Sequence, residues 1–288
     1  MNTENNPYGV YRFEDIAPRL DEYRKNGLPS GVSTGWKELD EYYTVMPGEF
    51  TVVTGAPNAG KSEFLEALLV HLASLHNWRF IMFTPENQPY ERHVAKIMEK
   101  FVGSPLADGP TPKMSDKEYS WAKKWGNQHF DYIHLEDPTL DSILECVDRA
   151  MRVAPDMQHG FVLDPWNEIE HERPKGLSET EYISWALSKI RRFARNKKAH
   201  VWIVAHPAKL QKDQSGKYPI VRPWDISGSA HWFNKADNCL SAYRDVTADD
   251  PHYLELYIQK VRFKNVGKVG NIELRWDFAT GRFTPTNI

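Results

Sequence analysis

The eight residues from Gly55 to Ser62 constrain this chain more than any other stretch. They follow the pattern G-x-x-x-x-G-K-S, as Gly55, Ala56, Pro57, Asn58, Ala59, Gly60, Lys61 and Ser62. An apolar run over 50–54 predicts a buried strand before the pattern, and apolar residues at helical spacing over 62–76 predict a helix after it. This context favours a phosphate-binding P-loop over a chance glycine-rich turn.

Each part of such a loop has a physical task. Glycines let the backbone approach a polyanion, and successive N–H groups together with the helix N-terminus point at its phosphates. Lys61 would reach the β and γ oxygens of a nucleotide, and the Ser62 hydroxyl would ligate Mg²⁺. The loop therefore predicts ATP and Mg²⁺ as cofactors.

Composition limits the class of protein. The 288 residues suit one large α/β domain with a short appendage, or two small domains. The sequence shows no run of about 18 apolar residues and begins with a polar segment, so we expect no membrane span, no signal peptide and no secretion. Two distant cysteines, Cys146 and Cys239, favour a reduced, cytoplasmic setting.

The net charge of −3 argues against a chain that coats nucleic acid indiscriminately. It leaves room for nucleic-acid binding through a few clustered lysines or arginines, because such a cluster can contact phosphates while the remaining surface stays acidic.

Residues 1–30 are predicted to form a separate N-terminal segment, a short amphipathic helix over 12–25 and a linker. Pro18 fits such a helix only if it starts near Ile16, and Asp15 would cap it. A lone helix this short is marginal in water. It must pack either on its own domain or on a neighbouring subunit, and the sequence leaves both open.

Residues 31–288 alternate between strand and helix patterns, which predicts an α/β domain with a mostly parallel sheet covered on both faces. Strands are expected at 50–54, 79–84, 132–135, 160–164 and 200–205. Beyond residue 237 the pattern changes to strands alone, which predicts antiparallel additions at 239–243, 253–263 and 271–276.

Three polar residues stand at predicted strand ends, as the P-loop does: Glu86, Asp164 and His206. Ligands of open α/β sheets bind outside the carboxyl ends of the strands. Asp164 resembles a Walker B carboxylate that holds Mg²⁺, and Glu86 would polarise an attacking water. Helix capping is the alternative for Glu86, and a simple strand-end hydrogen bond is the alternative to γ-phosphate sensing for His206.

A series of motifs then comes in a specific order. It comprises Gly31-Val32-Ser33-Thr34-Gly35-Trp36 with Leu39-Asp40, the P-loop, Thr84-Pro85-Glu86, Val204-Ala205-His206-Pro207, Asp225-Ile226-Ser227-Gly228-Ser229-Ala230 with Lys235-Ala236-Asp237, Tyr243-Arg244-Asp245, and Lys260-Val261-Arg262-Phe263. This series resembles the RecA-type motor domain of the DnaB-like replicative helicases, in the branch of Twinkle and the phage primase-helicases. The resemblance covers residues 31–288.

The resemblance implies a homo-oligomeric ring, commonly a hexamer, with ATP between neighbouring subunits and single-stranded DNA in the channel. It makes Glu86 the catalytic base, gives Lys61, Ser62 and Asp164 to phosphate and Mg²⁺, and lets His206 link the γ-phosphate to the DNA loop. The N-terminal helix resembles the linker helix that docks on the adjacent protomer.

Further residues match family positions. Arg262 matches the arginine finger and Lys260 its companion, both acting in trans, with an exposed strand residue as the alternative for Arg262. Arg244 and Trp276 match contacts to the adenine. The loop 207–222 matches the DNA-contacting loop, in which Lys209, Lys212 and Lys217 would track phosphates; a merely solvated loop is the alternative.

The sequence departs from phage relatives in two ways. It lacks an arginine in the segment 231–234, and no primase region precedes the motor. We therefore expect either part of a larger primase-helicase or a motor that works with a separate primase, loader and DNA polymerase, in a bacterial nucleoid or a phage-infected cell.

The predicted activity is ATP-driven 5′-to-3′ translocation and DNA unwinding, with the direction implied by the family alone. One alternative is a RecA/KaiC-type ATPase that binds DNA or assembles without unwinding. A second is a small-molecule P-loop kinase, which would need an arginine-rich lid.

Overall fold

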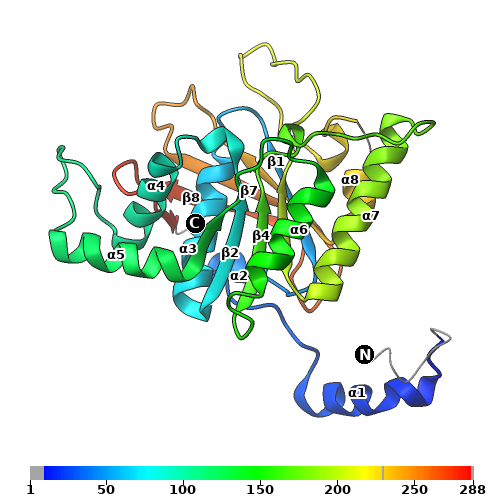
Figure 1. Ribbon diagram of the computed structural model, residues 1–288. Helices are drawn as coiled ribbons and strands as arrows, with labels where there is room; N and C mark the ends of the chain where they lie inside the picture. The colour runs from blue at the N-terminus through cyan, green and yellow to red at the C-terminus, as the bar shows by residue number, and fades with distance from the viewer. Residues whose placement is uncertain (1–9, 229, 287–288) are drawn as a thin grey trace.

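The computed structural model describes residues 10–228 and 230–286, and within them the strands form one nine-stranded sheet (Figure 1). Its order is β3-β2-β4-β5-β1-β6-β7-β8-β9. Six strands are parallel: β1 (Phe50–Gly55), β2 (Trp78–Phe83), β3 (Phe130–Tyr132), β4 (Gln158–Leu163), β5 (His200–Val204) and β6 (Asn238–Tyr243). Three antiparallel strands extend the sheet: β7 (Tyr253–Val261), β8 (Gly270–Trp276) and β9 (Phe283–Pro285).

Helices cover both faces of the parallel strands, because those strands are apolar on both sides. One face packs against α2 (Lys37–Asp40), α3 (Lys61–His76), α4 (Tyr90–Val102) and α5 (Asp116–His129). The other face packs against α6 (Leu140–Met151), α7 (Glu179–Lys197) and α8 (His231–Lys235). Short 3₁₀ turns follow three of the strands: η2 (Pro85–Asn87), η3 (Trp166–Glu168) and η4 (Pro223–Asp225).

The antiparallel strands are covered on one face only. In β7, buried residues alternate with half-buried ones, and Leu254, Leu256 and Ile258 join the core under α3. This period of two is what a strand with one covered face requires. The sequence predicted this change from a parallel to an antiparallel sheet, and the structure confirms it.

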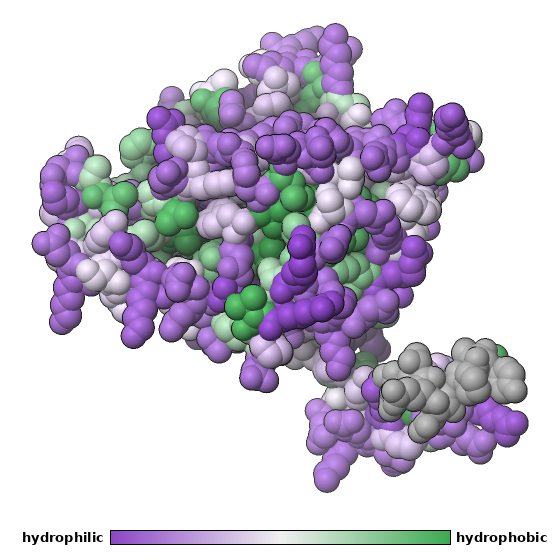
Figure 2. Space-filling view, in the orientation of Figure 1, coloured by the Kyte–Doolittle hydropathy of each residue, from purple (hydrophilic) through white to green (hydrophobic). Residues whose placement is uncertain are grey.

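The N-terminal helix α1 (Phe13–Asn26) buries none of its own residues, all of which lie in the described range. Phe13 is 77% exposed and Leu20 is 43% exposed. Figures 1 and 2 show α1 as a separate lobe joined to the body by a short connection. The α1 apolar side chains are therefore free to meet another surface.

Several predicted boundaries need correction. Helix α1 begins at Phe13 instead of near Ile16, so Pro18 lies inside it, and the Asp15 carboxylate accepts a hydrogen bond from the Arg12 N–H at 2.8 Å. A proline in that position removes one intrahelical hydrogen bond, which weakens the helix without ending it. The strand expected at 132–135 lies at β3, two residues earlier. Strand β9 and helix α2 were not predicted, since three or four residues carry too little periodicity.

Two parts of the sequence-based predictions fall on residues that the structure does not describe. Residues 1–9 of the N-terminal segment and Ser229 of the ordered motifs lie outside the described range. Among the described residues, no helix is both long enough and apolar enough to cross a membrane.

Candidate active site

Four adjacent parallel strands end at the same edge of the sheet, and each is followed by a predicted site residue. The strands are β2, β4, β5 and β1 in spatial order. Phe83 pairs with Leu163, Leu163 with Ile203, and Val53 with Val204, so the strand ends are level. The register thus brings Glu86, Asp164, His206 and the P-loop to one edge, as the sequence predicted. We call this edge the P-loop edge.

The P-loop conformation depends on two glycines. Gly55 has φ 149°, and a Cβ added there would lie 2.3 Å from the Ala242 carbonyl oxygen. Gly60 has φ 86° and forms the left-handed N-cap of α3. Both conformations disfavour a side chain. The first turn of α3 therefore presents its N–H groups toward the loop, which suits an anion.

The Lys61 side chain folds back over the loop. Its Nζ donates hydrogen bonds to the carbonyl oxygens of Gly55, at 3.1 Å, and Ala56, at 3.0 Å. Burial lowers the pKa of Lys61, and the charges of Asp164 and Glu86 oppose that shift. The ammonium is therefore a poorly solvated cation with weak neutral partners, and phosphate oxygens would be stronger partners.

The two acids at this edge lie in different surroundings. Burial raises the pKa of Asp164 to about 6, although a hydrogen bond from Ser62 opposes the shift. Glu86 is exposed on η2, and its pKa is also raised, by partial burial and by the charge of Glu168, against Lys61. A buried carboxylate beside a serine hydroxyl lacks a cation, whereas an exposed one can meet water.

These donors fit Mg²⁺ in part. The Ser62 hydroxyl and the Asp164 carboxylate are hard oxygen ligands, and Mg²⁺ takes few protein ligands and fills its remaining positions with water and phosphate oxygens. In agreement, no group of three or more His, Cys, Asp or Glu residues in the described parts of the chain could hold a metal.

His206 follows β5 and is half-buried. Burial lowers the pKa of His206, and the nearby Lys61 lowers it further. A cavity of about 260 Å³ lies beside the ring and is lined by Trp166, Asn167, Ala205, His206, Pro207, Ile226 and Ser227. The histidine thus lies between Lys61 and the start of the loop 207–222, so both sequence-based interpretations of it stay open.

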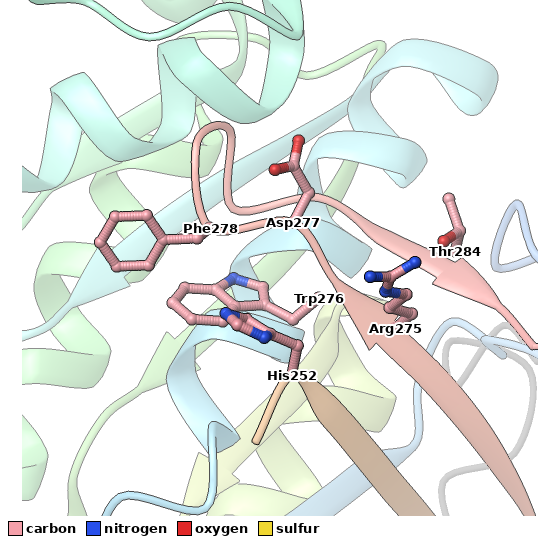
Figure 3. A pocket seen from close by; sticks show the side chains of 6 residues that line it. All are labelled: His252, Arg275, Trp276, Asp277, Phe278 and Thr284. Atoms are coloured by element: carbon pink, nitrogen blue, oxygen red, sulfur yellow. The ribbon is translucent and has the colours of Figure 1, made fainter. Parts of the chain in front are cut away.

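An aromatic pocket completes the P-loop edge on its other side (Figure 3). The Arg244 guanidinium lies 5.3 Å from the Trp276 ring centroid, although the two residues are far apart in the sequence. The Trp276 ring stacks with His252 at 6.0 Å and meets Phe278 edge-on at 5.5 Å. The pocket measures about 360 Å³. Because Gly55 pairs with Ala242, Arg244 leaves β6 at the P-loop edge, where a purine could stack.

Arg262 and Lys260 lie at the opposite edge of the sheet, which we call the finger edge. Val261 pairs with Asn238 and Thr51 with Asn238, so this end of β7 is level with the start of β1. The strand β1 lies between, and its six residues span about 17 Å at 3.3 Å each. Arg262 therefore cannot reach the P-loop of its own chain.

The finger edge holds its cations through anchored contacts. Arg262 Nε lies 2.8 Å from the buried Asp237 carboxylate, and its Nη2 donates to the carbonyl of Ala236 at 3.2 Å. Lys260 Nζ donates to the Phe233 carbonyl and lies 4.7 Å from that ring's centroid. Arg262 is partly buried in an ion pair, so the interpretation of it as a simple exposed residue is not favoured.

The three lysines of the loop 207–222 are exposed or half-exposed at the surface. Lys217 is paired with Asp245 at 2.7 Å, whereas Lys212 lies 4.9 Å from the centroid of the Tyr218 ring. Figure 1 shows the loop projecting from the body, in yellow. Lys209 and Lys212 are thus offered to solvent, while Lys217 is held against its own chain.

The structure brings in residues that sequence reasoning missed. Glu168 on η3 lies close enough to Glu86 to raise its pKa. Glu66 and His93 lie behind the site and are fully buried between α3 and α4. A glutamate inside the apolar run of 64–69 was the signal for the latter pair.

A P-loop followed by acids on adjacent parallel strands, in this strand order, defines a RecA-like P-loop nucleotide-binding domain. Residues 31–285 match the DnaB-like helicase C-terminal domain family. The chain belongs to this family. It is 39% identical, over 289 residues, to the Twinkle homolog protein, chloroplastic/mitochondrial, of Arabidopsis thaliana. That match covers 97% of this chain and 40% of the relative, so the chain spans well under half of that protein.

Solved structures agree on the fold. One, a helicase-type ATPase domain, superposes with a TM-score of 0.76 over 95% of this chain and 98% of that one, at 17% identity. A DnaB-like replicative helicase, solved in a study of its interactions with primase, gives 0.77 over 99% and 71%, at 16% identity. The predicted RecA-like class and the family resemblance are therefore confirmed.

Proposed function

We propose that this chain is the motor domain of a ring-forming replicative DNA helicase, which hydrolyses ATP between subunits and moves along single-stranded DNA. The observation that carries the proposal is the division of catalytic groups between two edges of the sheet. The P-loop edge holds Lys61, Glu86 and Asp164, and the finger edge holds Arg262. A complete site then requires the finger edge of a neighbouring chain.

At the P-loop edge, the backbone N–H groups and Lys61 bind the phosphates. Ser62 and Asp164 would hold Mg²⁺, which supplies charge neutralisation at the phosphate oxygens when bound. Glu86 is the exposed acid of the edge, and in its ionised form it accepts a proton from a water placed for attack. The Trp276–Arg244 pocket would stack the base.

The neighbour contributes Arg262, with Lys260 beside it. A guanidinium offers a planar fork of donors where charge develops in phosphoryl transfer. In this chain, Asp237 and the Ala236 carbonyl hold that fork at the end of β7. A preordered cation loses less conformational entropy on meeting the neighbour's nucleotide than a free side chain would.

The loop 207–222 is proposed to contact DNA. Lys209 and Lys212 are exposed, and Lys contacts to phosphates carry no sequence information, which suits a motor that tracks the backbone. His206 begins this loop and lies near Lys61, so movement at the γ-phosphate would reach the DNA through it. Strand polarity of 5′ to 3′ and work with a primase and a DNA polymerase belong to the same proposal.

We further propose that α1 docks on the adjacent protomer of the ring, which would have six subunits. The described body offers an apolar groove of about 540 Å³ between α4 and α5, lined by Val94, Ile97, Met98, Ala122, Lys123, Lys124, Gly126, Asn127, Phe130 and Tyr132. Figure 2 shows hydrophobic side chains over these helices. The groove carries two lysines and α1 carries four acids, so charge favours the pairing. Leu20→Asp and Ala122→Asp should each shift native mass from ring to monomer.

The cellular setting stays a prediction. A cytoplasmic location in a bacterial or phage-infected cell follows from the sequence, whereas the similar Arabidopsis protein is described as chloroplastic/mitochondrial.

The direct test is strand displacement on a forked DNA duplex with ATP and Mg²⁺. We expect displacement only when the fork has a free 5′ single-stranded arm, together with ATP hydrolysis that rises with single-stranded DNA. Hydrolysis stimulated by DNA without displacement on either fork would favour a RecA/KaiC-type ATPase instead.

A further inference from the structure

A buried polar network ties the helix that carries the P-loop residues to the helix that follows Glu86. Helix α3 contributes Glu63 and Glu66, and α4 contributes His93, Lys96 and Lys100. Lys100 Nζ lies 2.6 Å from Glu63 and 2.8 Å from Glu66, and Lys96 Nζ lies 2.6 Å and 3.0 Å from the same two carboxylates. Two acids thus face two lysines, which balances the buried charge.

His93 extends this network to the strand end before Glu86. Its Nε2 lies 3.1 Å from the Glu66 carboxylate, and its Nδ1 lies 3.3 Å from the Thr84 hydroxyl. A carboxylate only accepts, so Nε2 carries the proton, and Nδ1 of the neutral ring then accepts from Thr84. All three side chains are at most 2% exposed. The chain Thr84, His93, Glu66 therefore has one hydrogen-bonding direction.

The turn that carries Glu86 is fixed at both of its ends by these contacts. The turn η2 is three residues long, and Thr84 immediately precedes it. Helix α4 begins at Tyr90, soon after the turn, and is held to α3 by the lysines. Because Lys61 and Ser62 begin α3, the network sets where Glu86 stands relative to the phosphate cradle.

The charge state of Glu66 agrees with this structural task. Burial alone would raise the pKa of Glu66, but Lys100, the hydrogen bond from His93 and Lys96 outweigh it and hold that pKa below its usual range. The carboxylate stays ionised and keeps its partners oriented. A buried ion pair adds little net stability compared with apolar packing, so a contribution to position is its larger effect.

We propose that His93 and Glu66 are positioning residues for Glu86, acting through the Thr84 hydroxyl. This inference rests on the proposed role of Glu86 as the base. Neither side chain touches the nucleotide; both fix the turn from which Glu86 reaches the attacking water. A misplacement of a base by about 1 Å can cost on the order of a hundredfold in rate, and loss of one of several restraints would cost less.

Two variants remove the link to Thr84, and two are controls. Thr84→Val keeps the shape and deletes the hydroxyl, and Thr84→Ser keeps the hydroxyl. His93→Gln keeps a donor at the length of Nε2 and loses the acceptor at Nδ1. His129→Gln is the matched control, because His129 is a buried histidine that bonds the Trp78 carbonyl at 2.7 Å, at the start of β2.

The measurement is the single-turnover rate of ATP hydrolysis, with excess protein and single-stranded DNA, beside a separate titration of nucleotide affinity. We expect Thr84→Val and His93→Gln to lower the rate about tenfold and to change affinity less than about twofold. Thr84→Ser should keep the wild-type rate within about twofold. His129→Gln should lower the melting temperature and leave the rate unchanged.

A double-mutant cycle separates positioning from general damage. In the Glu86→Ala background, His93→Gln should cause no further loss of rate. A full multiplicative loss there, or a wild-type rate in Thr84→Val, would overturn the inference, and the Thr84 pair decides it should His93→Gln not fold. A wild-type rate in Glu86→Ala alone would instead remove the proposed base itself.

Discussion

The two edges of the sheet differ in how they treat charge. At the P-loop edge, Lys61 and Asp164 are buried with incomplete partners, and burial shifts the pKa of each toward its neutral form. At the finger edge, Arg262 already has a carboxylate at 2.8 Å and a backbone acceptor. One edge lacks its ligand, and the other is a finished surface. A ring places the second against the first, and this explains why both are needed.

The largest effect is expected at the P-loop edge. Lys61→Ala should abolish ATP turnover, by at least about a hundredfold, because the loop loses its only cation at the phosphates within the described residues 55–62. Turnover is measured with single-stranded DNA, and circular dichroism checks the fold. Lys61→Arg is the control for charge alone; retained turnover in the alanine variant would break the comparison.

A similar loss is expected at the finger edge, but without a loss of binding. Arg262→Ala should cut hydrolysis by about a thousandfold, since an arginine finger acts on the transition state. Nucleotide affinity, measured by fluorescence titration, should change little. Arg191→Ala removes another arginine near the same edge and should leave hydrolysis within about threefold; equal losses would mean that the edge acts through general charge.

A smaller effect sharpens the boundary of the P-loop edge. Trp276→Ala should raise the KM for ATP about tenfold and leave kcat nearly unchanged, because stacking on a base contributes roughly 1–3 kcal/mol to binding. Steady-state kinetics measure both constants. Trp276→Phe keeps a stacking face and should recover most of the affinity. A change in kcat alone would place Trp276 outside the base pocket.

The smallest effect concerns stability at the finger edge. Burial raises the pKa of Glu49 to about 7, while the Asn238 amide, which donates at 2.9 Å, opposes the shift and the Asp237 charge adds to it. The folded state therefore binds the proton more tightly than the unfolded one, and Glu49 costs stability increasingly as pH rises from about 4.5 through 7.

Glu49→Gln keeps an acceptor for Asn238 and removes that cost. At pH 8 it should raise the free energy of unfolding by on the order of 2 kcal/mol, or a melting temperature by about 5 °C. The gain should shrink toward pH 4.5. Thermal melts at both pH values measure it, and a gain independent of pH would contradict the assignment.

The sequence could predict the P-loop edge because each of its residues follows an apolar run, and parallel strands bring their ends together. It could not predict that Arg244 and Trp276 form a pair, or that Arg262 is held by Asp237, because those contacts depend on the register of β6, β7 and β8. The ordered motifs named these residues through resemblance alone.

The network behind Glu86 was hidden for a different reason. Glu66 and Lys100 read as surface positions of two amphipathic helices, and only the packing of α4 on α3 buries them against each other. Local periodicity describes one helix at a time, so it carries no information on which polar side chains face each other. The extended position of α1 is of the same kind, since its partner surface belongs to no local pattern.

The central claim is that each catalytic site is shared by two chains, and mixed assemblies test it most directly. Glu86→Ala and Arg262→Ala proteins are each inactive in this account, but a mixed ring contains some interfaces with an intact Glu86 on one side and an intact Arg262 on the other. After subunit exchange, followed by labelled subunits, we predict that an equimolar mixture recovers about a quarter of wild-type ATP hydrolysis, since random mixing leaves that share of interfaces intact. No recovery, despite demonstrated exchange, would contradict the shared site.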